Sequence, residues 1–165
     1  MARLDDNTAV FCTAEIPDDL LNSFFQTAYS APEFVNEGVD DVGVLINTVD
    51  PSTIDGPTKP PVPAQTAFPF INKTPEEIWQ FAQRHLQWPI FNRALAILDD
   101  RTVQDRSTCL LVTEWESPPL GQQSTLLKAR AEFRSALVIL NVKNLGIGGD
   151  EHFRAGAEGI VGPGD

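Results

Sequence analysis

The sequence predicts a single α+β domain over residues 1–165, with a mixed or antiparallel central sheet covered by helices. Residues 91–98 and 108–115, FNRALAIL and TCLLVTEW, are apolar runs on either side of the polar segment DDRTVQDRS, which is the pattern of a buried β-hairpin. Residues 18–29 and 75–87 carry apolar side chains three and four positions apart, as helices do. The length of 165 residues fits one ordinary domain, which buries roughly 70% of its unfolded surface.

The first predicted elements are a strand, a helix and a second strand. Residues 9–13, AVFCT, form a short apolar run typical of a strand. The helix at 18–29 begins with a proline and two acidic residues, which suit a helix N-terminus because proline fixes φ and negative charge interacts favourably with the helix dipole. Residues 42–49, VGVLINTV, are rich in β-branched residues and predict the second strand.

A proline-rich segment follows at about residues 51–71. Six prolines there remove backbone donors, so the segment is neither a central strand nor a helix. It is predicted either to leave the domain as a disordered excursion or to pack across the surface in extended form. Thr74, Pro75 and Glu77 then match a capping box, which predicts that the next helix starts at Pro75 and ends before Pro89.

The second half of the chain centres on the hairpin. Both faces of its strands are mostly apolar, so they are expected to be covered on two sides. Residues 127–134 alternate between apolar and charged side chains, which predicts a half-exposed strand with a basic outer face. Residues 136–145 fit a helix with Ser135 as its cap, although their β-branched content also fits a strand. The tail at 157–165 is expected to be loose.

Short motifs along this half resemble a known family. In order they are AILDDRT, CLLVTEW, AEFRS, VKNL and DEHF, and they cover about residues 91–155, with weaker support at 9–30. They resemble an uncharacterised domain family of small acidic proteins found in fungi and actinomycetes. The family has no assigned function, so the resemblance implies shape rather than chemistry. Its members look helical at the position of 136–145, which favours the helix there.

The net charge of −11 is unevenly distributed. Residues 1–50 hold ten acidic residues and one basic residue, whereas residues 101–150 hold five acidic and six basic residues. Phosphate backbones and anionic membrane surfaces would be repelled, so we expect neither nucleic-acid nor membrane binding. The acidic region is interpreted as a solvated surface or as a patch for a basic partner or a second copy of the chain.

The remaining motifs suggest no cofactor and no metal site. The acidic residues around 99–105 are expected to cap the turn, because calcium-loop spacing and its glycine are absent. Cys12 and Cys109 are expected to be buried, inert thiols, with a disulfide between them as the alternative if their strands are neighbours. The N-terminal segment lacks the apolar stretch of a signal peptide, which favours a cytoplasmic location; a secreted protein whose signal peptide is absent from this sequence is the alternative.

Two hypotheses for function remain open, and whether the protein is an enzyme is uncertain. The first is a non-enzymatic interaction module that binds a protein partner or forms a homodimer. The residues proposed for its interface are Trp88, Lys128, Arg130, Arg134, Asp40 and Asp41. The second is a small-molecule binding protein or enzyme with a pocket at the ends of the central strands. The residues proposed to line that pocket are Arg93, Asp99, Arg101 and Glu114.

Overall fold

A computed structural model describes residues 7–54, 56–86, 90–114, 120–121, 126–144 and 160–161. These residues form one six-stranded sheet in the order β2-β1-β3-β4-β5-β6. The strands are β1 (Asn7–Cys12), β2 (Gly43–Ile46), β3 (Ile90–Leu98), β4 (Thr108–Glu114), β5 (Leu126–Glu132) and β6 (Ile160–Val161). Strand β1 pairs in parallel with both β2 and β3, β4 is antiparallel to both β3 and β5, and β6 runs parallel to β5. The α+β class with a mixed sheet and the central hairpin are therefore confirmed.

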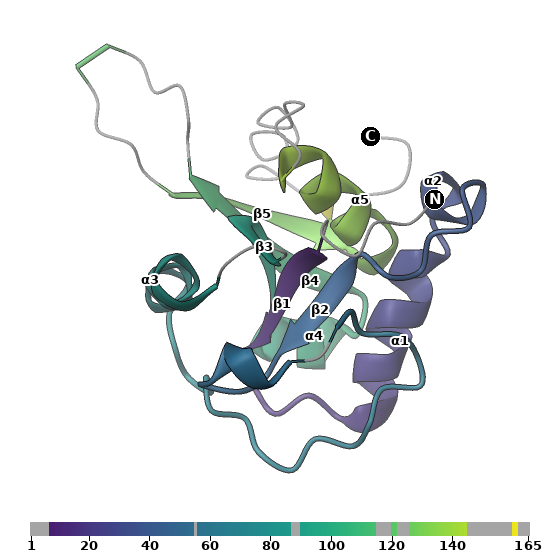
Figure 1. The fold of residues 1–165 in the computed structure, drawn as a ribbon, viewed down its shortest axis with the longest axis horizontal. Helices are drawn as coiled ribbons and strands as arrows, with labels where there is room; N and C mark the ends of the chain where they lie inside the picture. The colour runs from purple at the N-terminus through teal and green to yellow at the C-terminus, as the bar shows by residue number, and fades with distance from the viewer. Residues whose placement is uncertain are drawn as a thin grey trace.

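Helices cover both faces of this sheet (Figure 1). They are α1 (Asp18–Tyr29), α2 (Pro32–Val35), α3 (Pro75–His85), α4 (Asp100–Asp105) and α5 (Phe133–Asn144), with a 3-10 turn η1 at Pro51–Thr53. Helices α1 and α5 lie on one face and α3 on the other. The predicted helix at 136–145 is confirmed, but it begins at Phe133. Ser135 is therefore inside the helix, and Arg134, predicted in a strand, belongs to the first turn of α5.

The hairpin strands are apolar on both sides because both sides are covered. On β3, Ala94, Ala96 and Leu98 pack against the layer of α1 and α5. Leu95 and Ile97 point the other way and pack in the cluster that includes α3. The expectation that both faces of these strands are covered is therefore met on β3, whose successive side chains point to opposite faces. The link between the strands is helix α4 rather than a simple turn.

The proline-rich segment packs across the surface in extended form. Val62 within it is buried, and its backbone N–H donates to Oδ1 of Asn22 on α1 at 2.6 Å. Thr58 covers the outer edge of β2: its N–H donates to Gly43 O at 2.7 Å, and its Oγ1 accepts from the N–H of Leu45 at 2.8 Å. The hydroxyl of Tyr29 donates to Thr58 O at 2.7 Å and accepts from Gly43 N–H at 3.1 Å. These bonds occupy the edge of the sheet that a partner strand would otherwise use.

The end of the chain adds one short strand. Ile160 and Val161 pair with Arg130 and Ala131 of β5, so the prediction of a loose tail does not hold for these two residues. The rest of 157–165 lies outside the described residues. Within the described ranges, every helix is too short or too polar to cross a lipid bilayer.

Candidate functional site

The order of the first three strands creates a crevice at one edge of the sheet. From β1 the chain passes through α1 on one face to β2, and from β2 through α3 on the other face to β3. The two connections therefore leave the sheet on opposite sides, which makes the carboxyl ends of β1 and β3 a topological switch point. Open α/β sheets bind their ligands outside the strands at such a point.

A pocket of about 280 Å³ lies at this position. Its lining consists of Thr13, Asn72, Lys73, Pro75, Ile97, Asp99, Asp100 and Leu110. Thr13 directly follows β1 and Asp99 directly follows β3, while the segment that enters α3 supplies the third wall. We call this pocket the strand-end crevice. Polar side chains outnumber apolar ones in its lining, which suits a small polar ligand.

Backbone hydrogen bonds hold the three walls together. Thr13 N–H donates to Leu98 O at 3.0 Å and joins the ends of β1 and β3. Asn72 N–H donates to Thr13 O at 2.9 Å, and Asn72 has a left-handed backbone with φ of 63°, a conformation that asparagine tolerates better than most residues. The predicted capping box at Thr74 and Glu77 is confirmed, with both bonds at 3.1 Å, and fixes the start of α3.

Asp99 is fixed by two sets of contacts. Its Oδ1 accepts from the N–H of Thr102 at 3.1 Å, so it caps α4, as the interpretation of the turn acids predicted. Both of its carboxylate oxygens accept hydrogen bonds of 2.7 Å from the guanidinium of Arg130 on β5. Burial alone would raise the pKa of Asp99, but the hydrogen bonds and charge of Arg130 and the bonds from Thr102 outweigh it and lower the pKa below its ordinary value. Asp99 is therefore a charged structural wall of the crevice.

Asp100 and Lys73 are the charged groups that face solvent in the crevice. The side chain of Asp100 is exposed, and the structure gives it no ion pair among the described residues. The ammonium of Lys73 lies 3.7 Å from the carboxylate of Glu77, and both side chains are about half exposed, so this pair holds Lys73 only weakly. A ligand can compete for both groups.

The four residues predicted to line a pocket do not form one site. Asp99 lines the crevice, and Arg101 lies nearby on α4, where it pairs with Asp105 at 3.6 Å. Arg93 and Glu114 lie near the opposite ends of β3 and β4, because Ala94 pairs with Thr113 there. Asp99 lies six positions after Arg93 along the strand, which corresponds to roughly 20 Å. The structure therefore does not bring these four residues together.

The residues predicted for an interface also do not lie together on one surface. Arg130 is buried in its contact with Asp99, and Asp41 is buried as well, so neither lies on an exposed charged surface. The remaining predicted residues are distributed as follows: Lys128 pairs with Glu76 on α3, Asp40 pairs with Lys59 at 3.3 Å, Arg134 is exposed, and Trp88 lies outside the described residues. The cations of β5 thus meet acids beyond residue 50 in the same chain, rather than the acidic first fifty residues.

The two cysteines are free, buried thiols. Cys12 is on β1 and Cys109 on β4, with β3 between them, so the condition for the alternative disulfide is not met. Burial raises the pKa of each thiol to about 12, which keeps it protonated and unreactive. Within the described ranges, no three His, Cys, Asp or Glu side chains are grouped as metal ligands would be.

Sequence reasoning missed Thr13, Asn72 and Lys73 as site residues. A usable signal existed, because a polar residue directly follows an apolar strand at both Thr13 and Asp99. It becomes informative only once the two strands are known to be parallel neighbours, since only then do both carboxyl ends meet at the same edge.

No family model, curated protein or solved structure matches this chain. The resemblance to the small acidic family therefore stays a prediction, and function has to be inferred from the geometry of the site.

Proposed function

We propose that this protein is a small-molecule binding domain whose ligand occupies the strand-end crevice. The observation that carries the proposal is the position of the crevice at the switch point between β1 and β3, with polar side chains from three chain segments around it. Pockets for drug-sized ligands have volumes of roughly 300–1,000 Å³. At about 280 Å³, this crevice suits a smaller compound.

The charges of the lining indicate the chemistry of the ligand. Arg130 neutralises Asp99, so Asp100 supplies the available negative charge and accepts hydrogen bonds. Asn72 and Thr13 add groups that can both donate and accept. A compact metabolite with amino or hydroxyl groups matches this lining better than a large anion does.

The lining favours binding over covalent chemistry. Among the described residues that line the crevice, there is no serine, cysteine or histidine. The carboxylate of Asp99 is engaged by Arg130 and Thr102, so it is poorly placed to accept a proton from a substrate. We therefore propose a binding role.

A thermal-shift screen of small amines, amino acids and polyols tests this proposal. A ligand at 100 times its Kd stabilises the folded state by about 2.7 kcal/mol. The shift should shrink in Asp100→Asn and in Asn72→Gly, since glycine keeps the left-handed backbone and removes the amide. Glu33→Gln, which removes an exposed acid on α2, is the matched control. Hits that shift all three variants as they shift the wild type would contradict binding in the crevice.

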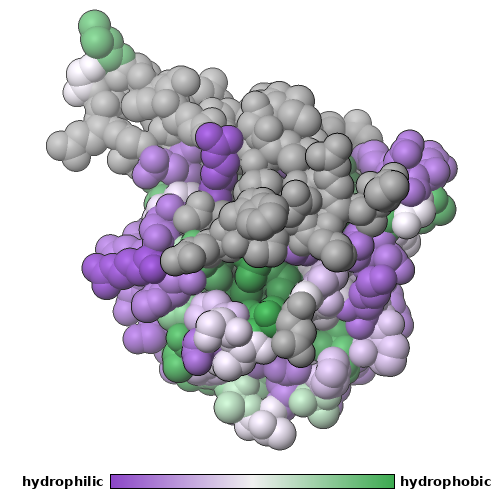
Figure 2. Space-filling view, viewed as in Figure 1, coloured by the Kyte–Doolittle hydropathy of each residue, from purple (hydrophilic) through white to green (hydrophobic). Residues whose placement is uncertain are grey.

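Association through α2 is a second candidate function. Val35 on α2 is 60% exposed, and Glu33 and Glu37 beside it are exposed and have no ion pair within the described part of the chain. Hydrophobic and hydrophilic side chains lie next to one another over α2 (Figure 2). An exposed apolar residue between acids suits a basic protein partner or a basic surface of a second copy.

Light scattering across a range of protein and salt concentrations tests self-association. A homodimer held by these acids should dissociate as salt rises, and the double variant Glu33→Lys with Glu37→Lys should weaken it. A molecular mass that stays monomeric at every concentration would exclude the homodimer. If the protein is monomeric, capture by a defined basic peptide tests the basic partner. Equal capture of the wild type and the double variant would exclude it.

A further inference from the structure

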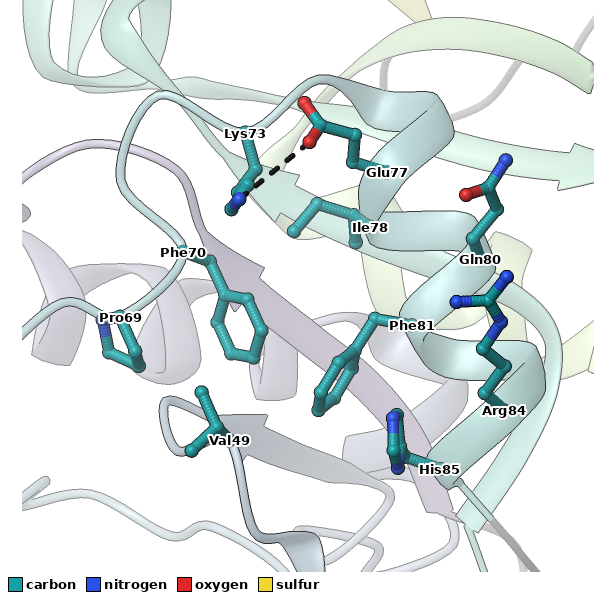
Figure 3. A pocket seen from close by; sticks show the side chains of 10 residues that line it. All are labelled: Val49, Pro69, Phe70, Lys73, Glu77, Ile78, Gln80, Phe81, Arg84 and His85. Atoms are coloured by element: carbon teal, nitrogen blue, oxygen red, sulfur yellow. Dashed lines mark ion pairs between the residues drawn. The ribbon is translucent and has the colours of Figure 1, made fainter.

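A second pocket, of about 260 Å³, lies between α3 and the segments that carry Val49 and Phe70 (Figure 3). Its lining consists of Val49, Pro69, Phe70, Lys73, Glu77, Ile78, Gln80, Phe81, Arg84 and His85. Of the described residues that line this pocket and the strand-end crevice, the two share Lys73 alone. We call it the α3 pocket. Nothing in the proposed function uses it.

The body of the α3 pocket is apolar and partly aromatic. The rings of Phe70 and Phe81 meet edge to face with centroids 4.8 Å apart, and Phe70 packs in the same way on Phe11 of β1 at 5.2 Å. Phe70 is buried, so its ring is held in place from behind. Val49 is 65% exposed, and its side chain lines the same pocket as the two rings (Figure 3). An apolar ligand would cover Val49 and the part of Phe81 that water now contacts.

The rim of the α3 pocket is basic, although the protein as a whole is acidic. Lys73 lies at one end beside Glu77, and His85 lies at the other, with its ring 4.6 Å from that of Phe81 (Figure 3). Arg84 lies on the α3 side and has no ion pair among the residues that the structure describes. A net charge of −11 repels anions, but such repulsion is screened beyond about 10 Å in ordinary salt. Cations at the pocket itself therefore decide which ligand binds.

We infer that the α3 pocket binds a small monocarboxylate with an aromatic or branched apolar body. The body lies against Val49 and the exposed part of Phe81, and the carboxylate lies at the α3 rim that carries Arg84 and His85. Arginine forms paired hydrogen bonds with a carboxylate, which a neutral analogue cannot replace. A pocket of about 260 Å³ favours a small acid over a nucleotide, whose several charges would also meet the carboxylate of Glu77.

Titration with phenylacetate, followed by amide chemical shifts in NMR spectra, tests this inference. Saturable shifts are expected on α3 and around Phe70, with a Kd of about 1 mM or tighter, the range of a fragment-sized ligand. Phenylacetamide has the same shape without the charge and should bind the wild type about ten-fold more weakly. Phenylacetate should bind Arg84→Gln about ten-fold more weakly than it binds the wild type. Acetate lacks the ring and should give no saturable shift.

A pair of matched valine variants separates the pocket from the rest of the surface. Val49→Glu places a carboxylate at the pocket and should abolish phenylacetate binding. Val35→Glu makes the same change at a similarly exposed residue on α2 and should leave it intact. Equal binding of phenylacetate and phenylacetamide, or shifts that survive both Val49→Glu and Arg84→Gln, would overturn the inference. So would the absence of saturable shifts on α3.

Discussion

The guanidinium of Arg130 and the carboxylate of Asp99 form a bidentate ion pair that joins β5 to the end of β3. Both N–O distances are 2.7 Å, and Nε of Arg130 also donates to Oγ1 of Thr108 on β4 at 2.9 Å. The side chains of Arg130 and Asp99 are 10% and 25% exposed. One arginine thus ties three strands to the helix that Asp99 caps. The pair sets both the position and the charge of one wall of the strand-end crevice.

Replacement of Arg130 should destabilise the protein strongly. Arg130→Met leaves the carboxylate of Asp99 partly buried without its partner, and we expect a loss of about 3 kcal/mol in the free energy of unfolding. Urea denaturation measures the change. Lys59→Met is the control, because its pair with Asp40 is exposed and should contribute less than about 1 kcal/mol.

A double variant tests whether the cost arises from the unpaired charge. Asp99→Asn keeps a side chain that caps helices well but removes the charge. In combination with Arg130→Met, it should recover part of the stability that Arg130→Met alone loses. If the two single changes simply add, the ion pair is not the source of the loss.

Acid should weaken the protein partly through Asp99. Its pKa is lowered in the folded state, so the stability it contributes is present above its ordinary value of 3.8 and is lost as the pH falls through the folded pKa. The free energy of unfolding of the wild type should therefore fall more steeply than that of Asp99→Asn between about pH 4 and about pH 2. Urea titrations across this range measure both slopes. Equal slopes in the wild type and Asp99→Asn would contradict the role of Asp99.

Gly43 on β2 should not tolerate a side chain. A Cβ atom there would lie 3.1 Å from Leu137 Cδ1, 3.1 Å from Phe25 Cε1 and 3.2 Å from the Tyr29 hydroxyl. Because α1 and α5 pack closely over this position, Gly43→Ala should cost about 1–3 kcal/mol. Gly56→Ala is the control: nothing lies within 4 Å of the position that its methyl group would take, and the change should be neutral or stabilise by up to about 1 kcal/mol. Thermal unfolding of the two variants compares them, and equal melting temperatures would contradict close packing at Gly43.

The sequence predicted the positions of helices and strands better than it predicted which strands pair. Apolar runs and helical spacing depend on neighbouring residues, so α1, α3 and the β3–β4 hairpin could be located from the chain alone. The parallel pairing of β1 with β3 joins residues about eighty positions apart, and no local pattern encodes it. The strand-end crevice depends on that pairing. Its residues could therefore not be grouped in advance.

Arg130 shows the same limit at a single side chain. The alternation of residues 127–134 correctly placed Arg130 on the other face of β5 from Ala129 and Ala131. These two alanines pack in the layer of α1 and α5. A two-residue period shows which face a side chain occupies, but not what covers that face. Here Asp99 and Thr102 cover it, so a residue predicted to be exposed and available to a partner is buried.

Removal of the Tyr29 hydroxyl should loosen the cover on the edge of β2. Tyr29→Phe leaves Gly43 N–H and Thr58 O without their shared partner, and we expect a loss of about 1–3 kcal/mol. Hydrogen exchange of the Gly43 and Thr58 amides should accelerate, while the amides of β3 and β4 keep their rates. Thr58→Val is the control: it should speed the exchange of Leu45, whose N–H donates to Thr58 Oγ1, but leave that of Gly43 unchanged. Unaltered exchange at Gly43 in Tyr29→Phe would show that the hydroxyl does not hold this edge.

Cys12 and Cys109 should resist modification until the protein unfolds. Both thiols are buried, and their raised pKa of about 12 leaves almost no thiolate near pH 8, although the thiolate is the reactive form. A chromogenic disulfide reagent should therefore titrate no thiol in the native protein and both in denaturant, with the same result with and without prior reduction. In each of the single variants Cys12→Ala and Cys109→Ala, the reagent should titrate one thiol after unfolding. A count below two in unreduced, unfolded wild-type protein would indicate a disulfide, which would require β1 and β4 to approach each other across the position that β3 occupies.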